Sequence, residues 1–161
     1  MTKPLMTMEL HGFKELEREL LKFSDKLARR SLARAVSSGA AIVRTKAREH
    51  ARARGLYDTG NLVKSIRIRK MKTRNWRTTA IYGVYHGSKG WYGALHERGY
   101  RPGGGTTFVQ NPHLRPALDE NTSAVIQAIR DRLSKEIRVM RFETATGMKY
   151  KKAFESQLGN Y

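Results

Sequence analysis

Apolar residues in the first third of the chain recur every three or four positions, which is the spacing of one helix face. Residues 13–21 follow this spacing and predict a short first helix. We expect a longer second helix to begin near Ser24 or Asp25, because a short polar side chain there can accept a hydrogen bond from a free backbone amide. Small residues at 37–41 predict that another element packs close to its backbone. The expected apolar stripe of this helix is Leu32, Val36, Ala40, Val43 and Ala47.

The period changes to two after residue 64, and this change predicts strands. Ile66, Ile68 and Lys70 point to one side of the first strand. Its other side is basic, and we expect it to face solvent; it carries Ser65, Arg67 and Arg69. A polar hairpin loop at 73–78 then leads to a second strand at 79–85. A third short element at 91–97 precedes a glycine-rich loop at 99–105.

The end of the chain predicts a final amphipathic helix at 118–140, followed by an extended C-terminal arm. The core face of this helix is expected to be Leu118, Val125, Ile129, Leu133 and Ile137. The order of elements predicts an α+β fold: a short and a long N-terminal helix, an antiparallel β-sheet and a C-terminal helix packed on the sheet. We expect residues 1–140 to form one domain. Residues 141–161 show no sustained period, and their aromatic side chains predict a docking arm.

Composition narrows the class of protein only slightly. With 161 residues the chain has the length of one ordinary domain with one core. It has no cysteine, which excludes disulfides and cysteine-ligated zinc and fits synthesis in a reducing cytoplasm. No apolar run approaches the roughly 18 residues that span a bilayer, and residues 1–9 lack the apolar centre of a secretory signal. We therefore expect a soluble, untargeted protein without membrane contact.

The formal net charge of +18 is concentrated in one region of the chain. Residues 26–77 hold 16 of the 32 Lys and Arg residues, against Glu49 and Asp58, so this segment alone contributes +14. A regional positive field attracts phosphate backbones or acidic protein partners, and the attraction weakens as salt rises. The charge therefore indicates an anionic partner and leaves its kind open.

Five motifs occur in order along residues 9–140. They are Gly12-Phe13, the alanine-rich basic helix at 33–47, the run Thr59-Gly60-Asn61-Leu62-Val63-Lys64-Ser65-Ile66, the spaced Tyr92, Glu97 and Gly99, and the run Pro112-His113-Leu114-Arg115-Pro116-Ala117-Leu118. In this order they resemble the head-tail joining proteins of long-tailed bacteriophages, also called neck or tail-completion proteins, which are relatives of minor tail protein Z. The loop at 100–110 and the arm are longer than in the family pattern, and His113 replaces an aromatic residue.

The resemblance implies a structural virion protein without catalytic activity or cofactor. Such a protein joins or completes the interface between the head connector and the tail tube, as a ring around the DNA channel. The implied partners are further copies of the chain, a head-connector or head-closure protein, and a tail-terminator or tail-tube protein. Tail symmetry favours six subunits, with twelve as the alternative. The implied location is the virion neck or the head-proximal end of the tail, with assembly in the host cytoplasm.

The motif residues are expected to have structural roles. They are Thr59, Gly60, Leu62, Ser65, Ile66, Glu97, Gly99, Pro112, Leu114, Arg115 and Pro116. We expect Gly60 to supply a positive φ angle between the long helix and the strand, and the Thr59 hydroxyl to satisfy a backbone amide. Pro112 and Pro116 suit the entry to the last helix. Ring contacts are expected from the first helix, the glycine-rich loop and the arm.

Enzymatic and metal-binding functions find little support in the chain. Ile81-Tyr82 and Trp91-Tyr92-Gly93 only partly match the paired runs of Gly-Ile-Tyr nucleases, and Glu97 and Arg98 lie too close in sequence to serve as the separate catalytic residues. The five histidines lack the helical pairing of a metal site, so we expect ordinary surface or partly buried roles for them. We expect neither an enzyme nor a metal site.

Two alternatives to the ring protein stay open. Basic and apolar residues alternate between 64 and 77, next to Trp76, Tyr82 and Tyr85, and this pattern also fits a free-standing nucleic-acid-binding module. A tail-assembly factor that is absent from the finished particle is the other alternative. The expected contacts to phosphate or to an acidic partner, in either setting, are Arg67, Arg69, Arg74 and Arg77.

Overall fold

The computed structural model of the chain describes residues 16, 18, 25–56, 59–72 and 79–158. Most of the expected first helix and the whole expected hairpin loop lie outside these ranges. The fold is α+β, as predicted. In chain order the elements are α2 (Asp25–Ala53), α3 (Asn61–Ser65), β1 (Ile66–Met71), β2 (Ile81–His86), the 3-10 turn η1 (Ser88–Gly90), α4 (Gly93–Arg98), the 3-10 turn η2 (Pro102–Gly104), α5 (Leu114–Asp119) and α6 (Thr122–Leu158).

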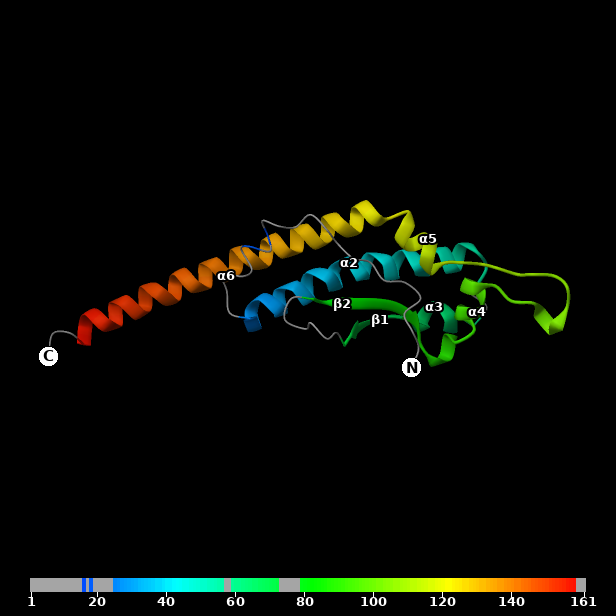
Figure 1. The fold of residues 1–161 in the computed structure, drawn as a ribbon, viewed down its shortest axis with the longest axis horizontal. Helices are drawn as coiled ribbons and strands as arrows, with labels where there is room; N and C mark the ends of the chain where they lie inside the picture. Colours follow the sequence, from blue (N-terminus) through cyan, green and yellow to red (C-terminus); the bar gives the residue numbers. More distant parts are fainter. Residues whose placement is uncertain (1–15, 17, 19–24, 57–58, 73–78, 159–161) are drawn as a thin grey trace.

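The elements form three layers with α2 in the middle (Figure 1). Strands β1 and β2 pair antiparallel, with Ile66 opposite His86 and Met71 opposite Ile81. Helix α2 contacts both strands on one side and contacts α6 extensively on the other. The expected packing of the final helix on the sheet is therefore corrected: α6 packs on α2, because α2 already covers the apolar face of the sheet.

Small residues let α6 approach the backbone of α2. The buried positions of α2 recur every four residues and are Ser31, Ala35, Gly39, Val43, Ala47 and Ala51. A Cβ atom on Gly39 would lie 2.7 Å from Cγ1 of Ile129 and 3.0 Å from Cγ1 of Val125. The predicted close packing at 37–41 is confirmed. The predicted stripe was only partly right, since Leu32, Val36 and Ala40 are half-buried while smaller neighbours fill the interface.

Polar contacts reinforce the pairing of the two long helices. The Glu136 side chain is 10% exposed, and its carboxylate accepts from Arg34 Nη1 of α2 at 2.9 Å and from Arg132 Nη2 one turn away at 2.7 Å. The Ser38 hydroxyl donates to the Ala35 carbonyl of its own helix at 2.6 Å and shares this proton with the Ala128 carbonyl of α6 at 3.2 Å. The predicted core face is confirmed for Val125, Ile129, Leu133 and Ile137, which are buried, whereas Leu118 is half-buried and belongs to α5.

The final helical region differs from its prediction at both ends. It begins as the separate short helix α5, and the chain turns at Glu120 and Asn121 before α6 starts. It also continues past Met140 to Leu158, so the segment expected to be an irregular arm is helical to that residue. This part of α6 extends beyond the other labelled elements (Figure 1), and both Arg141 and Phe142 are exposed there. The boundary between domain and docking arm stays a prediction.

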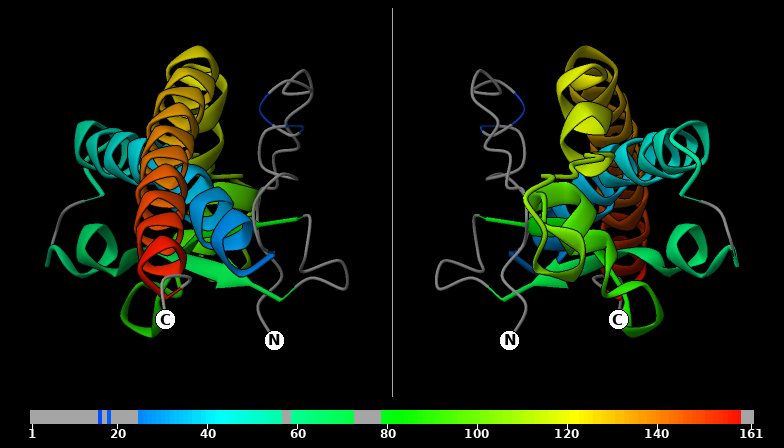
Figure 2. Two further views of the ribbon diagram at one scale, coloured as in Figure 1. Left: turned by 90° about the vertical axis from the view of Figure 1, so that its left-hand side faces the viewer. Right: turned by 90° about the vertical axis from the view of Figure 1, so that its right-hand side faces the viewer.

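Figure 2 views the molecule along its long axis and shows α6 crossing over α2.

In the part of the chain that the structure describes, no helix is both long and apolar enough to cross a membrane.

The contact between α2 and α6 predicts a position where added volume is not tolerated. Gly39→Val should lower the free energy of unfolding by about 1–3 kcal/mol, since the new side chain would overlap Ile129 and Val125. Thr45→Val, on the exposed face of the same helix, is the matched control and should change stability much less. Urea unfolding of both variants measures the difference, and equal stabilities would show that the helices are not in close contact at this point.

Candidate functional site: a motif junction and a basic pocket

The first motif run forms the turn from the long helix to the sheet. Gly60 has φ 69° and ψ −3°, the left-handed conformation expected for it, and the Thr59 hydroxyl accepts a hydrogen bond from the Asn61 amide at 3.4 Å. The chain then makes the short helix α3 before β1 begins, an element that the sequence pattern did not predict. Gly60 is therefore needed for its backbone conformation, since residues with a Cβ atom rarely adopt it.

Helix α3 packs against the backbone of the segment that follows β2. Leu62 and Ile66 are fully buried, and the Ser65 hydroxyl donates to the Leu62 carbonyl at 2.7 Å. A Cβ atom on Gly90 would overlap the Ser65 side chain, and one on Gly93 would overlap Leu62. The spacing of Leu62, Ser65 and Ile66 therefore reflects a tightly packed junction.

Glu97 connects α4 to the motif run that begins at Pro112. From α4 its carboxylate accepts three backbone hydrogen bonds at the start of α5, from the amides of His113 at 2.9 Å, Leu114 at 2.9 Å and Arg115 at 2.8 Å. Amides at the start of a helix have no partner within the helix, and a carboxylate there also interacts favourably with the helix dipole. Glu97 thus fixes α5 on α4.

The other motif residues support this connection. Gly99 has φ 87°, and the Phe108 ring occupies the place that a Cβ atom would take. Leu114 is buried and Pro116 lies in the first turn of α5, while Arg115 is exposed. Pro112 precedes α5 and lies outside it. Together these residues build a structural joint between α4 and α5.

A buried pair of histidines lies beside this joint. His86 Nε2 and His113 Nε2 are 2.7 Å apart, and the two side chains lie on β2 and just before α5. His113 Nδ1 faces the Asn111 carbonyl at 3.2 Å, so it carries the proton and leaves Nε2 to accept from His86. His86 Nδ1 is then unprotonated, and among the described residues it has no partner.

Ordinary surface or partly buried roles were predicted for the histidines, and for this pair the prediction is wrong. His113 is fully buried and His86 is 8% exposed, so neither is a surface side chain. Burial lowers the pKa of both side chains. The pKa of His86 falls to about 4, because His113 and His96 lower it further and the Glu97 carboxylate raises it less than burial lowers it. Within the described residues no three His, Cys, Asp or Glu side chains could hold a metal ion together.

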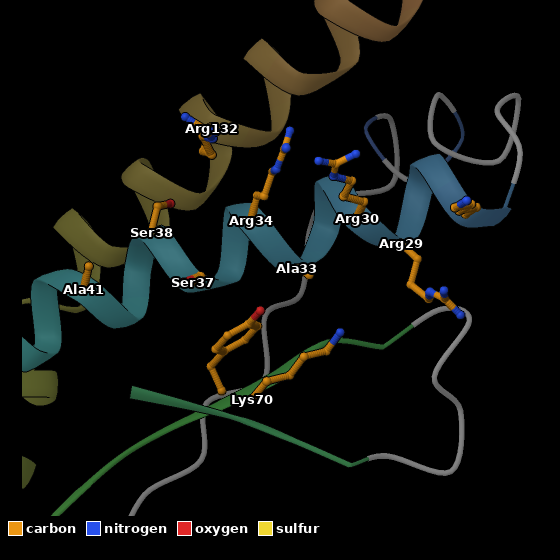
Figure 3. A pocket seen from close by; sticks show the side chains of 11 residues that line it. Arg29, Arg30, Ala33, Arg34, Ser37, Ser38, Ala41, Lys70 and Arg132 are labelled. Carbon is orange, nitrogen blue, oxygen red and sulfur yellow. The ribbon is translucent and has the colours of Figure 1, made fainter. Parts of the chain in front are cut away.

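The surface beside the middle layer carries a second candidate site, which we call the basic pocket (Figure 3). It has a volume of about 770 Å³ and takes residues from α2, from both strands and from α6. Small residues of α2, among them Ala33, Ser37 and Ala41, leave the space open. Its charged lining consists of Lys26, Arg29, Arg30, Arg34, Lys70 and Arg132.

The two sides of β1 contribute differently to the basic surface. Lys70 and its cross-strand partner Tyr82 line the pocket, and Figure 3 shows Lys70 in the space between α2 and the strands. Arg67 and Arg69 are exposed and alternate with Lys70 along the strand, so they lie on the outer face, as predicted. Arg74 and Arg77 lie outside the described residues.

The outer face of β1 follows from the sequence pattern, whereas the pocket was not predicted. The signal was present in α2, where Lys26, Arg29 and Arg30 are followed at helical spacing by small residues. Burial raises the pKa of the Tyr82 phenol, so this residue stays a neutral hydrogen-bonding group at the pocket wall.

The Glu97 joint predicts a large effect from one carboxylate. Glu97→Ala should lower the free energy of unfolding by about 2 kcal/mol or more, because it leaves three backbone amides without their acceptor. Glu120→Ala, at the other end of α5 with a side chain 60% exposed, is the matched control. Thermal melts that shift equally for both variants would contradict the capping role.

The histidine pair predicts loss of stability in acid. A depressed folded pKa means that the unfolded chain binds the proton first, so the stabilisation is complete above about pH 6.5 and is lost as the pH falls toward about 4. The loss should reach about 2–3 kcal/mol. His86→Gln, whose amide can still donate to His113, should flatten this pH dependence.

The measurement is urea unfolding at several pH values between about 7.5 and 4.5. His50→Gln serves as the control, since His50 lies 3.2 Å from the exposed Glu120 carboxylate and outside the buried pair. A His86→Gln profile parallel to that of wild type would show that the pair does not titrate as described.

Comparison with known proteins gives a match to one family. A family model described as "Bacteriophage HK97-gp10, putative tail-component" matches residues 14–99, more than half of the chain. Searches of curated proteins and of solved structures found no significant match. The matched range includes the Thr59-Gly60 turn and ends at Gly99. It therefore includes Glu97, whose carboxylate binds the amides at the start of α5. The chain belongs to the HK97-gp10-like family of bacteriophage tail components.

Proposed function

We propose that this tail component joins or completes the interface between the head connector and the tail tube, as a non-enzymatic ring around the DNA channel. The observation that carries the proposal is the presence of two different projections at opposite ends of the molecule (Figure 1). A closed ring of more than two subunits needs such a pair, because each copy contacts its neighbours through two unlike surfaces.

The first projection is the loop at 100–109, together with α4. Tyr100 and Val109 pair as an isolated bridge at its base. Exposed apolar side chains lie along this end, with Trp91 at 67%, Phe108 at 57% and Leu95 at 39% exposure. Large exposed aromatic residues are typical of surfaces that bind another protein.

The second projection is the C-terminal part of α6. Val139 is 47% exposed and Phe142 is 74% exposed, while the neighbouring Met140 is buried against α2. This end therefore offers the apolar side chains of Val139 and Phe142, which the described part of the chain leaves exposed. A ring of six subunits would match tail symmetry, with twelve as the alternative. The faces outside the two projections would contact a head-connector or head-closure protein and a tail-terminator or tail-tube protein.

A free-standing nucleic-acid-binding module is the alternative, and the exposed Arg67 and Arg69 favour it. Within a neck the same side chains would contact DNA phosphates in the channel or acidic neighbours. We favour acidic neighbours, because a channel lining that held DNA tightly would slow its ejection. The mass of the assembled particle separates a ring from a monomeric or dimeric module.

Removal of residues 141–161 tests the proposal in the virion. The truncated protein should fold and melt close to wild type, since Met140 retains its buried contact and the exposed Phe142 side chain beyond it is lost. It should nevertheless fail to enter particles, so that heads and tails accumulate unjoined. Electron microscopy and mass spectrometry of purified particles measure both outcomes.

Single substitutions refine the same experiment. Phe142→Ser should reduce incorporation strongly, whereas Arg138→Ser, exposed one turn earlier on the same helix, is the control. Wild-type yields of infectious phage from the truncated gene would contradict the docking role. Absence of the wild-type protein from finished virions would instead identify an assembly factor.

A further inference from the structure

We infer that the basic pocket binds an acidic polypeptide segment of a partner protein. Six cationic side chains line the pocket, and no carboxylate is among the described residues of its lining. Within the described residues, Lys26, Arg30 and Lys70 form no ion pair. The pocket therefore holds positive charge that the described part of the chain does not neutralise.

A carboxylate of the chain itself shows the chemistry that these cations accept. Glu136 lies beside the pocket, and its two oxygens receive Arg34 Nη1 at 2.9 Å and Arg132 Nη2 at 2.7 Å. Both arginines also line the pocket. A partner carboxylate placed beyond them would meet the next cations along α2, Arg30 and Lys26. Hydrogen bonds between a cation and a carboxylate are among the stronger ones in proteins.

The shape of the pocket favours a polypeptide over DNA. Its volume of about 770 Å³ is that of a small-ligand pocket, so it has room for a few side chains. Proteins that read duplex DNA instead insert a helix or a ribbon into its groove. Surfaces for single strands carry several aromatic rings on which bases stack, whereas the part of the lining that the structure describes has one aromatic residue, Tyr82.

The lining also supplies neutral donors of the kind that orient carboxylates. Tyr82 faces the pocket from β2, and the hydroxyls of Ser37 and Ser38 lie on α2. Ser38 already donates to the Ala35 carbonyl at 2.6 Å, so Tyr82 and Ser37 are the hydroxyls available to a ligand. If the pocket attracted a ligand through its net charge alone, these hydroxyls would not contribute to the affinity.

Fluorescence anisotropy with a labelled hexaglutamate peptide tests the site on the full-length protein. Arg30→Gln with Lys70→Gln removes two charges from the pocket. Lys64→Gln with Lys89→Gln removes two charges from exposed positions outside the pocket and is the matched control. We expect the pocket variant to bind about ten-fold more weakly and the control variant to change less than about three-fold.

A neutral change distinguishes a built site from a diffuse field. Tyr82→Phe keeps every charge and should still weaken peptide binding by about three-fold or more, through the lost hydroxyl. Circular dichroism and melting of each variant verify the fold. Equal losses in the pocket and control variants would overturn the inference, as would unchanged binding by Tyr82→Phe.

Nucleic acid is tested in the same format, with labelled single-stranded and duplex oligonucleotides at equal ionic strength. Tighter binding of either oligonucleotide, lost in the pocket variant and retained in the control, would assign the pocket to phosphate and overturn the inference. Because the assay uses purified protein, its failure leaves the head-tail role untouched, and particle assembly tests that role separately.

Discussion

The close approach of α6 to the backbone of α2 is the constraint on which the rest of this structure depends. It exists because Ala35, Gly39 and other small residues form the buried face of α2, which leaves room for Ile129 and Val125. Small side chains on the opposite side of the helix, such as Ala33 and Ser37, leave the space that becomes the basic pocket. One compositional feature of α2 therefore accounts for both the helix packing and the surface available to partners.

A second constraint fixes the far end of the molecule. Glu97 gathers three amides at the start of α5, so α4 and α5 hold a fixed relation while the loop between them projects. The His86–His113 pair fills the same joint with two neutral rings, which works only in one arrangement of protons. The projection and the joint thus depend on each other: the loop at 100–109 can present Phe108 because its two ends are anchored at Glu97.

The sequence pattern predicted elements with a regular spacing of apolar residues. It did not predict features that depend on contacts between residues far apart in the chain. The core positions of α6, the strand Ile66–Met71 and the conformation of Gly60 follow from local rules and were predicted. The order of the layers was not, because no periodicity says that α2 covers the sheet before α6 can. The buried His113 was missed because its partner His86 lies 27 residues away. The pocket combines cations from α2, β1 and α6, and only the fold brings them together.

The distribution of charge connects the pocket to assembly. The segment 26–77 carries +14, and copies of a strongly positive subunit repel one another when a ring brings them together. Apolar contacts at the two projections must then overcome this repulsion, unless anions neutralise part of it. An acidic segment in the pocket would neutralise positive charge between α2 and the strands. Acidic neighbours or DNA would neutralise Arg67 and Arg69 on the outer face of the sheet. If the subunits form the proposed ring, closure should therefore be favoured where the anionic partners are already present, that is, at the junction itself.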